Sequence, residues 1–494
     1  MTGEETKKTH VAIIGGGPGG YAAAFMANDL GLDVTIIETH PNPGGVCLFR
    51  GCIPSKALLH VAKIITEARE AEHWGITFSE PRLNLERLRE SKNSVVEKLT
   101  GGLGQLCKAR GVNFIQGRAD FVNSQTLHIM REDGAEQELK TDYTILATGS
   151  RPTTLPDTYL ESPRLMDSTN ALDIDDLPES LLVIGGGYIG LELGSVYAAL
   201  GTNVTICEMT PSLLPGVDQD LVRILHKRME SIMTNIMLNT KVANIEEQKD
   251  GLKCRFEGEN APKKEQVFEK VLVCIGRKPN SSGVGLRNTG VKVDERGFVK
   301  VDPARWTDDP HILAIGDITG EPMLAHKASH EGRVAAEAVA GQRVAFEPYA
   351  IPAVVFTDPE VAYCGLTEDQ AKEQGIEVKT SKFPWGASGR ALTLNRAEGL
   401  TKLISDPETE QILGVGIVGS GAGELISEGV LAVEMGATAH DIGLSIHPHP
   451  TLGETIMETA DLIFGQSTHI YQKPKGKKAE AEAASTGEEQ AQTT

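Results

Sequence analysis

The sequence predicts an α/β protein with two Rossmann-like dinucleotide-binding domains and a C-terminal α+β dimerisation domain. Two observations carry this prediction. A glycine-rich turn between an apolar strand and a small-residue helix occurs twice, first at Gly15 and again at Gly185. After Phe346 the pattern changes to short alternating strands and helices, which is typical of an α+β domain.

Length, charge and cysteine content limit the class of protein. The 494 residues suit about three domains, and 48 Lys and Arg against 68 Asp and Glu give a net charge of −20. This surface repels phosphate backbones and anionic lipid, so we expect no nucleic-acid or membrane partner. Glycines interrupt the apolar stretch 11–27, unlike a signal peptide or a membrane span. We therefore expect a cytoplasmic protein. The seven cysteines are odd in number and sparse, which argues against a secreted disulfide framework and favours thiols that are mostly buried and reduced, so any disulfide is expected to be redox-active rather than structural.

Each glycine turn is followed by a second strand that ends in an acid, at the same spacing in both copies. The strands are 10–14 and 34–38 in the first copy, and 181–184 and 204–208 in the second. Three glycines in each copy allow the tight turn, close approach of a pyrophosphate and close helix packing: Gly15, Gly17, Gly20, Gly185, Gly187 and Gly190. The acids Glu38 and Glu208 are expected to hold ribose hydroxyls, and Glu208 favours NAD over NADP.

Three further buried strands suggest how the chain is divided. Residues 143–150 and 271–277 resemble return strands of the two nucleotide domains, and 312–317 adds a third whose Asp317 could accept bonds from sugar hydroxyls. The chain therefore is expected to return to its first domain after completing the second. The predicted segments are 1–151 (first nucleotide domain), 152–280 (second), 281–348 (return to the first), 349–470 (C-terminal domain) and 471–494 (a disordered polar tail).

Cys47 and Cys52 lie shortly after Glu38, next to Lys56. Their spacing is too wide for a zinc knuckle and no second pair follows, which disfavours a metal site. Two buried structural thiols are the plain alternative. If a helix begins near Gly51, its N-terminus and Lys56 would stabilise a thiolate, and the two thiols could close a redox-active disulfide.

These motifs together resemble the class I flavoprotein pyridine nucleotide-disulfide oxidoreductases, and among them the dihydrolipoamide dehydrogenases, along residues 8–470. The segments that carry the resemblance are the turn 15–20, the cysteine segment 47–56, 147–150, 185–192, 275–277, 316–317 with 323–327, and 447–454. The resemblance implies FAD on the first unit and NAD on the second. It also implies that Cys47 exchanges with substrate while Cys52 faces the flavin.

The resemblance assigns further residues to each cofactor. The FAD set is Gly15, Gly17, Gly20, Glu38, Lys56, Thr148, Gly149, Asp317 and Ala325. The NAD set is Gly185, Gly187, Tyr188, Gly190, Glu192, Glu208 and Gly276. Lys56 would lie near the flavin and pair with Glu192.

His449 and Glu454 match the family's acid–base pair, in which a neutral imidazole takes the substrate thiol's proton and the carboxylate orients the ring. The resemblance implies that this histidine comes from the other subunit of a homodimer. His447 is expected at most to support the turn. Two departures from the family pattern are Arg50, which adds a positive charge near Cys47, and Tyr188, which could cover the flavin until nicotinamide binds.

The reaction implied is flavin-dependent oxidation of protein-bound dihydrolipoamide to lipoamide with reduction of NAD. The lipoyl partner could belong to a 2-oxo acid dehydrogenase complex, the glycine cleavage system or another lipoate-binding protein. Glu208 disfavours an NADP-linked glutathione or trypanothione reductase, the lack of cysteines after Cys364 disfavours a mercuric reductase, and Cys47 disfavours a soluble transhydrogenase. A scaffold subunit without catalysis would not need these thiols together with His449.

Overall fold

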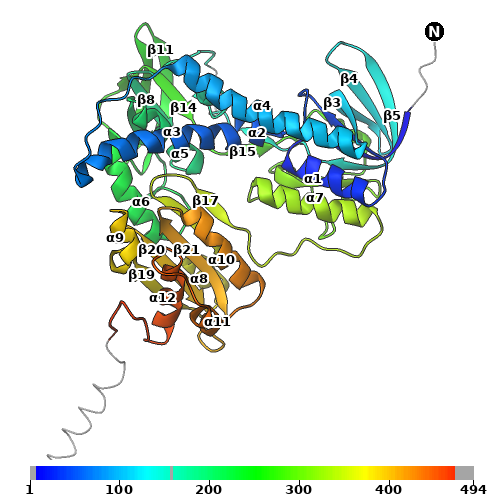
Figure 1. Cartoon of the computed structure of the whole chain (residues 1–494). Helices are drawn as coiled ribbons and strands as arrows, with labels where there is room; N and C mark the ends of the chain where they lie inside the picture. Colours follow the sequence, from blue (N-terminus) through cyan, green and yellow to red (C-terminus); the bar gives the residue numbers. More distant parts are fainter. Residues whose placement is uncertain (1–6, 156–159, 473–494) are drawn as a thin grey trace, which may run out of the picture. The chain divides into compact units, whose positions relative to one another are not determined.

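The computed structural model describes residues 7–155 and 160–472. The described residues divide into two compact units, one within 7–215 and 229–348 and the other within 216–228 and 349–472 (Figure 1). The predicted tail lies outside the described residues except for 471 and 472. In the described part, no helix is long and apolar enough to cross a membrane.

The first sheet of unit 1 is built around a parallel core. Its strands are β1 (Lys7–Ile14), β2 (Val34–Glu38), β3 (Asn113–Asn123), β4 (Thr126–Arg131), β5 (Glu136–Leu146) and β16 (Ile312–Ala314). Strand β1 pairs in parallel with β2 and β5, and β16 pairs in parallel with β5. The chain therefore returns to this sheet late in unit 1, as the sequence predicts.

Two helices rich in small residues pack side by side against this sheet, α1 (Pro18–Asp29) and α7 (Ala325–Val339) (Figure 1). Alanines on both helices, including Ala23 and Ala335, are fully buried in one core with strand residues such as Ile13. Small side chains on both helices let their backbones approach closely.

The second sheet of unit 1 repeats the parallel arrangement. Its order is β10 (Asn235–Met237), β9 (Asn203–Cys207), β8 (Ser180–Ile184), β14 (Lys270–Val273) and β7 (Leu165–Asp167), and α5 (Tyr188–Ala199) follows β8. Smaller sheets are made by β11 (Thr240–Gln248), β12 (Gly251–Gly258) and β13 (Gln266–Phe268), and by β6 (Ser150–Pro152) with β15 (Arg277–Pro279). Three further helices of unit 1 are α2 (Gly45–Arg50), α3 (Cys52–Glu70) and α4 (Leu85–Arg110).

Unit 2 is an antiparallel sheet with helices, which confirms the predicted change of pattern. Its strand order is β17 (Ala353–Val355), β18 (Glu360–Gly365), β21 (Ile412–Gly419), β20 (Leu400–Ser405) and β19 (Lys379–Pro384). Its helices are α8 (Glu368–Gln374), α9 (Gly389–Thr393), α10 (Ala422–Glu434), α11 (Ala439–Leu444) and α12 (Glu454–Ile463). The core contains the fully buried Trp385 together with residues such as Ile417 and Ile456.

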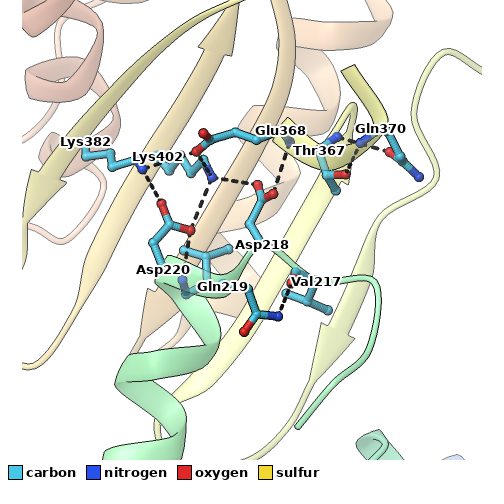
Figure 2. A network of polar contacts seen from close by, with 10 residues as sticks. Val217, Asp218, Gln219, Asp220, Thr367, Glu368, Gln370, Lys382 and Lys402 are labelled. Atoms are coloured by element: carbon cyan, nitrogen blue, oxygen red, sulfur yellow. Dashed lines mark hydrogen bonds and ion pairs between the residues drawn. The ribbon is translucent and has the colours of Figure 1, made fainter. Parts of the chain in front are cut away.

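Unit 2 also includes residues 216–228, which contain the start of α6 (Gln219–Ile232) and which the sequence analysis placed in the second nucleotide domain. The reason is a buried ion cluster (Figure 2). The Lys402 amine, on β20 and almost fully buried, contacts Asp218 at 2.7 Å, Asp220 at 3.2 Å and Glu368. Lys382 adds a second cation, 2.6 Å from Asp220. The three carboxylates are close enough to hold a metal ion, but the Lys402 amine bonds to all of them.

Candidate active site

The first glycine turn joins β1 to α1. Gly15 has a φ of +106°, and a Cβ there would overlap the carbonyl oxygen of Ala147. The Glu38 carboxylate, at the end of β2, accepts hydrogen bonds from the amides of Gly16 and Thr39, both at 2.7 Å. The acid that ends the second strand therefore lies directly against the turn, where a ribose next to a pyrophosphate would be held.

The second turn, between β8 and α5, has the same geometry. Gly185 has a φ of +112°, and a Cβ there would overlap the carbonyl oxygen of Cys274. Glu208, which follows β9 and is buried, accepts from the amides of Gly186 at 2.6 Å and Thr210 at 2.7 Å. The equal spacing in the sequence thus corresponds to equal placement of the carboxylate in space.

The two cysteines of the predicted dithiol lie next to each other where α2 is followed by α3. Cys47 is on α2, Cys52 is the first residue of α3, and a hydrogen bond joins the two sulfur atoms. That bond from Cys47, together with the charge of Lys56, outweighs burial and lowers the pKa of Cys52 to about 7. The same bond, burial and the Cys52 charge raise the pKa of Cys47. Cys52 is therefore the sulfur that becomes a thiolate near neutral pH, while Cys47 keeps its proton.

Lys56 connects the two halves of unit 1. Its amine lies 2.7 Å from a carboxylate oxygen of Glu192 on α5, which is the contact that the resemblance implies. The Glu192 side chain is 4% exposed, whereas that of Lys56 is 32% exposed. An ammonium held by a buried carboxylate places a fixed positive charge beside the thiols.

A single cavity extends from the first glycine turn to the dithiol. Its lining includes Glu38, Cys52, Lys56, Tyr188 and Asp317, and it also includes Gly15, Gly17, Thr148, Gly149, Glu192 and Ala325 from the predicted cofactor sets. Gly20 and Gly276 are not among its lining residues, since Gly20 packs against the Gly15 carbonyl group. The cavity therefore runs from the predicted ribose end to the predicted redox end, as an elongated dinucleotide requires.

Several lining residues of this cavity were not assigned to a site from the sequence, and Ser150 and Arg277 are two polar residues among them. The Ser150 hydroxyl group donates to Asp317 at 2.5 Å and accepts from the Arg277 guanidinium at 2.7 Å. Both residues end a return strand that was predicted from the sequence. A polar residue at the end of such a strand is the feature from which these two site residues could have been predicted. Burial raises the pKa of Tyr188, on the same cavity, to about 12, so its hydroxyl group stays protonated.

The predicted acid–base pair lies in unit 2, in the loop before α12. His449 Nδ1 is 2.8 Å from Glu454 Oε1, and the Thr451 amide donates to the other carboxylate oxygen at 2.7 Å. Burial opposes ionisation of Glu454, but these two bonds outweigh it and lower the pKa of the carboxyl group. The His449 side chain is 72% exposed, so its other ring nitrogen is open to a substrate.

His447 lies in a different environment from His449. Its side chain is only 8% exposed, and its ring nitrogens contact the Ser445 carbonyl oxygen and Glu428 on α10, both at 2.8 Å. This arrangement holds the loop against α10, as the sequence analysis expected of a residue that supports the turn.

Comparison with known proteins decides the family. Residues 9–332 match the pyridine nucleotide-disulphide oxidoreductase family model, and residues 351–460 match the dimerisation domain of the same family. The chain belongs to the pyridine nucleotide-disulphide oxidoreductases. Family members work with FAD and a pyridine nucleotide, and the two glycine turns with their acids fit these groups.

Relatives within the family are similar over nearly the whole chain. A dihydrolipoyl dehydrogenase of Haemophilus influenzae is 49% identical over 94% of this chain and 96% of its own. One of Geobacillus stearothermophilus is 45% identical over 96% of this chain and all of its own length. The crystal structure of LpdA from Mycobacterium tuberculosis matches with a TM-score of 0.85 at 27% identity, over 92% of this chain and 99% of that one.

Proposed function

We propose that this pyridine nucleotide-disulphide oxidoreductase is a dihydrolipoyl dehydrogenase, which oxidises dihydrolipoamide to lipoamide and reduces NAD to NADH. The observation that carries the proposal is the Cys47–Cys52 pair at the start of α3, with one low-pKa thiol, beside Lys56 and on a cavity that begins at a dinucleotide turn. Relatives at 45–49% identity with the name dihydrolipoyl dehydrogenase support the substrate.

Each step of the proposed reaction is assigned to particular residues of this chain. The first turn and Asp317 would hold FAD, which when bound would supply two-electron transfer between the dithiol and NAD. In the oxidised protein Cys47 and Cys52 would be joined by a disulfide, and one substrate thiol would attack Cys47, which breaks that disulfide and releases Cys52 as the thiolate that Lys56 stabilises. The second substrate thiol would then displace Cys47 from the mixed disulfide, which releases lipoamide and leaves both cysteines reduced. His449 accepts the proton of the substrate thiol as that thiol attacks, and Glu454 holds the imidazole in the required orientation. Glu208 holds the NAD ribose and disfavours a 2′-phosphate.

We place the protein in a homodimer in which His449 serves the thiols of the other subunit. The match to the family's dimerisation domain supports this arrangement. Exposed apolar side chains on and near α10 and α11 also support it, because water-exposed patches of this kind mark protein interfaces: Leu431, Met435, Leu444 and Ile446. Ile446, which is 99% exposed, lies on the loop that carries His449.

A substrate panel tests the reaction. The purified protein is expected to reduce NAD with dihydrolipoamide and to show little activity with NADPH and oxidised glutathione or mercuric ion. Turnover of those two oxidants, without turnover of dihydrolipoamide, would favour the alternative of a related disulfide reductase. A panel of lipoylated carrier domains, from 2-oxo acid dehydrogenase complexes and from the glycine cleavage system, then identifies the lipoyl partner by the lowest KM.

Mixing two inactive variants tests the shared site. Cys52→Ser and His449→Gln homodimers are each expected to be almost inactive. Subunit exchange between them would produce heterodimers with one intact site, so activity should reappear. If tagged heterodimers form and remain inactive, each subunit must supply its own histidine, and this part of the proposal is wrong.

A further inference from the structure

A second histidine–carboxylate pair lies next to the proposed acid–base pair. Helix α12 begins with Glu454, which holds His449, and Glu458 follows one turn later. Residues four apart share one face of a helix and are close neighbours. Glu458 Oε1 is 2.6 Å from Nδ1 of His469, so two imidazole rings are bound to adjacent carboxylates on one helix.

Glu458 fixes the position of His469 through several contacts. The Glu458 side chain is only 4% exposed, and a buried carboxylate requires donors. The donors come from one segment: the Ser467 hydroxyl group at 2.5 Å, the Thr468 amide at 3.0 Å and the His469 ring. The His469 side chain is 51% exposed, so the ring is anchored but remains accessible to solvent.

We propose that His469 is a positioning residue whose charge acts through Glu458 and Glu454 on the proton affinity of His449. This inference rests on the proposed function of His449 as the base. When His469 is neutral, Glu458 presents an uncompensated negative charge one helical turn from the pair, which favours the imidazolium form of His449. When His469 is protonated, that charge is neutralised and His449 stays neutral, and therefore able to accept a proton, at lower pH.

The electrostatics around Glu454 agree with this arrangement. Burial raises the pKa of Glu454, while the Thr451 amide, His449 and the charge of His469 lower it by a larger amount. Burial, together with the Glu458 charge, raises the pKa of Asp461 on the same helix, so Asp461 responds to the same carboxylate.

A lysine and a histidine from the neighbouring elements contact the C-terminal end of α12. The Lys379 amine of β19 donates to the Ile463 carbonyl oxygen at the end of the helix, at 2.7 Å. The His440 ring of α11 packs edge-on against Phe464, with 5.9 Å between ring centres. His469 is therefore the cation that the described structure places directly on Glu458.

The test compares two substitutions of opposite charge in the full-length protein. His469→Gln removes the titratable charge, and His469→Lys makes it permanent. The primary readout is the rate at which diethyl pyrocarbonate modifies the His449 peptide as a function of pH, because this reagent attacks only the neutral imidazole. The second readout is the acid limb of kcat/KM for dihydrolipoamide. His128→Gln is the matched control, since His128 pairs with Glu136 on an exposed sheet surface of unit 1.

We expect both profiles to move to higher pH in His469→Gln and to lower pH in His469→Lys, each by a few tenths of a pH unit. The His128→Gln profiles should superimpose on those of the wild type. If the two His469 variants shift in the same direction or not at all, His469 only anchors the C-terminal segment and the inference is wrong. If the modification profiles shift as expected but no dihydrolipoamide is oxidised, the inference holds and the proposed function fails.

Discussion

The two dinucleotide turns differ in what the chain does after each of them. In both, the loop after the second strand returns to the turn: the Gly44 amide donates to the Gly16 carbonyl oxygen at 2.7 Å, and the Leu214 amide donates to that of Gly186 at 3.0 Å. The first loop then continues into α2 and α3, which carry the thiols. The second continues into residues 216–228, which the Lys402 cluster fastens to unit 2. The two halves therefore share the geometry of the turn and differ in the segment that follows it.

The largest loss of activity should come from removing a thiol, because only the first dinucleotide turn is followed by the cysteine pair. Cys52→Ser eliminates the thiolate and is expected to reduce dihydrolipoamide oxidation to background, because no disulfide can form. Both turns stay intact, so FAD should remain bound and NADH should still reduce it. Stopped-flow absorbance of the flavin with each reductant measures both reactions. Cys107→Ser, at a buried cysteine away from the cavity, is the control and should keep both.

Matched substitutions at the turns test whether the halves bind separate cofactors. Gly15→Ala and Gly185→Ala each force a Cβ onto a carbonyl oxygen at a positive φ, with a strain of about 1–3 kcal/mol. We expect Gly15→Ala to lose FAD during purification. Gly185→Ala should retain FAD but bind NAD about 10- to 100-fold more weakly, as that strain implies. The flavin content of the purified variants measures FAD retention, and titration with NAD measures the affinity for NAD. Loss of FAD in both variants would contradict the assignment.

Replacing Glu208, the acid of the second turn, tests the predicted NAD site without changing the first turn. Glu208→Gln removes the charge from the carboxylate that would hold the ribose, and we expect the KM for NAD to rise about 10-fold or more. The preference for NAD over NADP should decrease at the same time, because repulsion of a 2′-phosphate is lost. Glu38→Gln serves as the control and should leave the KM for NAD unchanged.

Lys56→Met tests the contact between the halves. Loss of its positive charge should raise the pKa of Cys52 from about 7 by about one unit, since an adjacent cation favours the thiolate. The thiolate exists above this pKa, so it should be lost at a higher pH than in the wild type as the pH falls. The thiolate–flavin absorbance of the two-electron-reduced protein, titrated with pH, reports the midpoint. An unchanged midpoint would show that the Cys47 hydrogen bond alone sets the pKa.

The smallest effect is expected at Tyr188, the first residue of α5 and a neighbour of the predicted flavin site. Tyr188→Ile should change the rate at which NADH reduces the flavin, because the ring would no longer cover it, while dihydrolipoamide reduction of the flavin should stay the same. Identical NADH kinetics in the two proteins would reject the idea that Tyr188 is a gate.

Local motifs allowed much of the site to be predicted from the sequence. Both turns, Glu38 and Glu208 follow from spacing, since the length of a strand–turn–helix unit fixes where its last residue lies. The helix predicted near Gly51 begins at Cys52, so the thiols and Lys56 are placed by local structure as well. The domain boundaries, and the roles given to individual site residues, remain predictions.

Contacts between distant segments could not be read from spacing. Lys402 binds Asp218 of the segment 216–228 and Glu368, and so joins that segment to unit 2. In the sequence, nothing distinguishes these two acids from acids on the protein surface. The Ser150 to Asp317 bond and the Glu458 to His469 pair also depend on tertiary packing that no local period encodes. The Lys56 to Glu192 contact came only from resemblance to the family.

The most direct test of the central claim is an anaerobic reaction of the purified yellow protein with dihydrolipoamide, followed by NAD. We expect a long-wavelength absorbance band on addition of dihydrolipoamide, which a Cys52 thiolate next to oxidised flavin would give, and then formation of NADH. A flavin spectrum that dihydrolipoamide leaves unchanged but NADH bleaches would contradict it. The fold and both cofactors would stand, and a different disulfide would have to be the substrate.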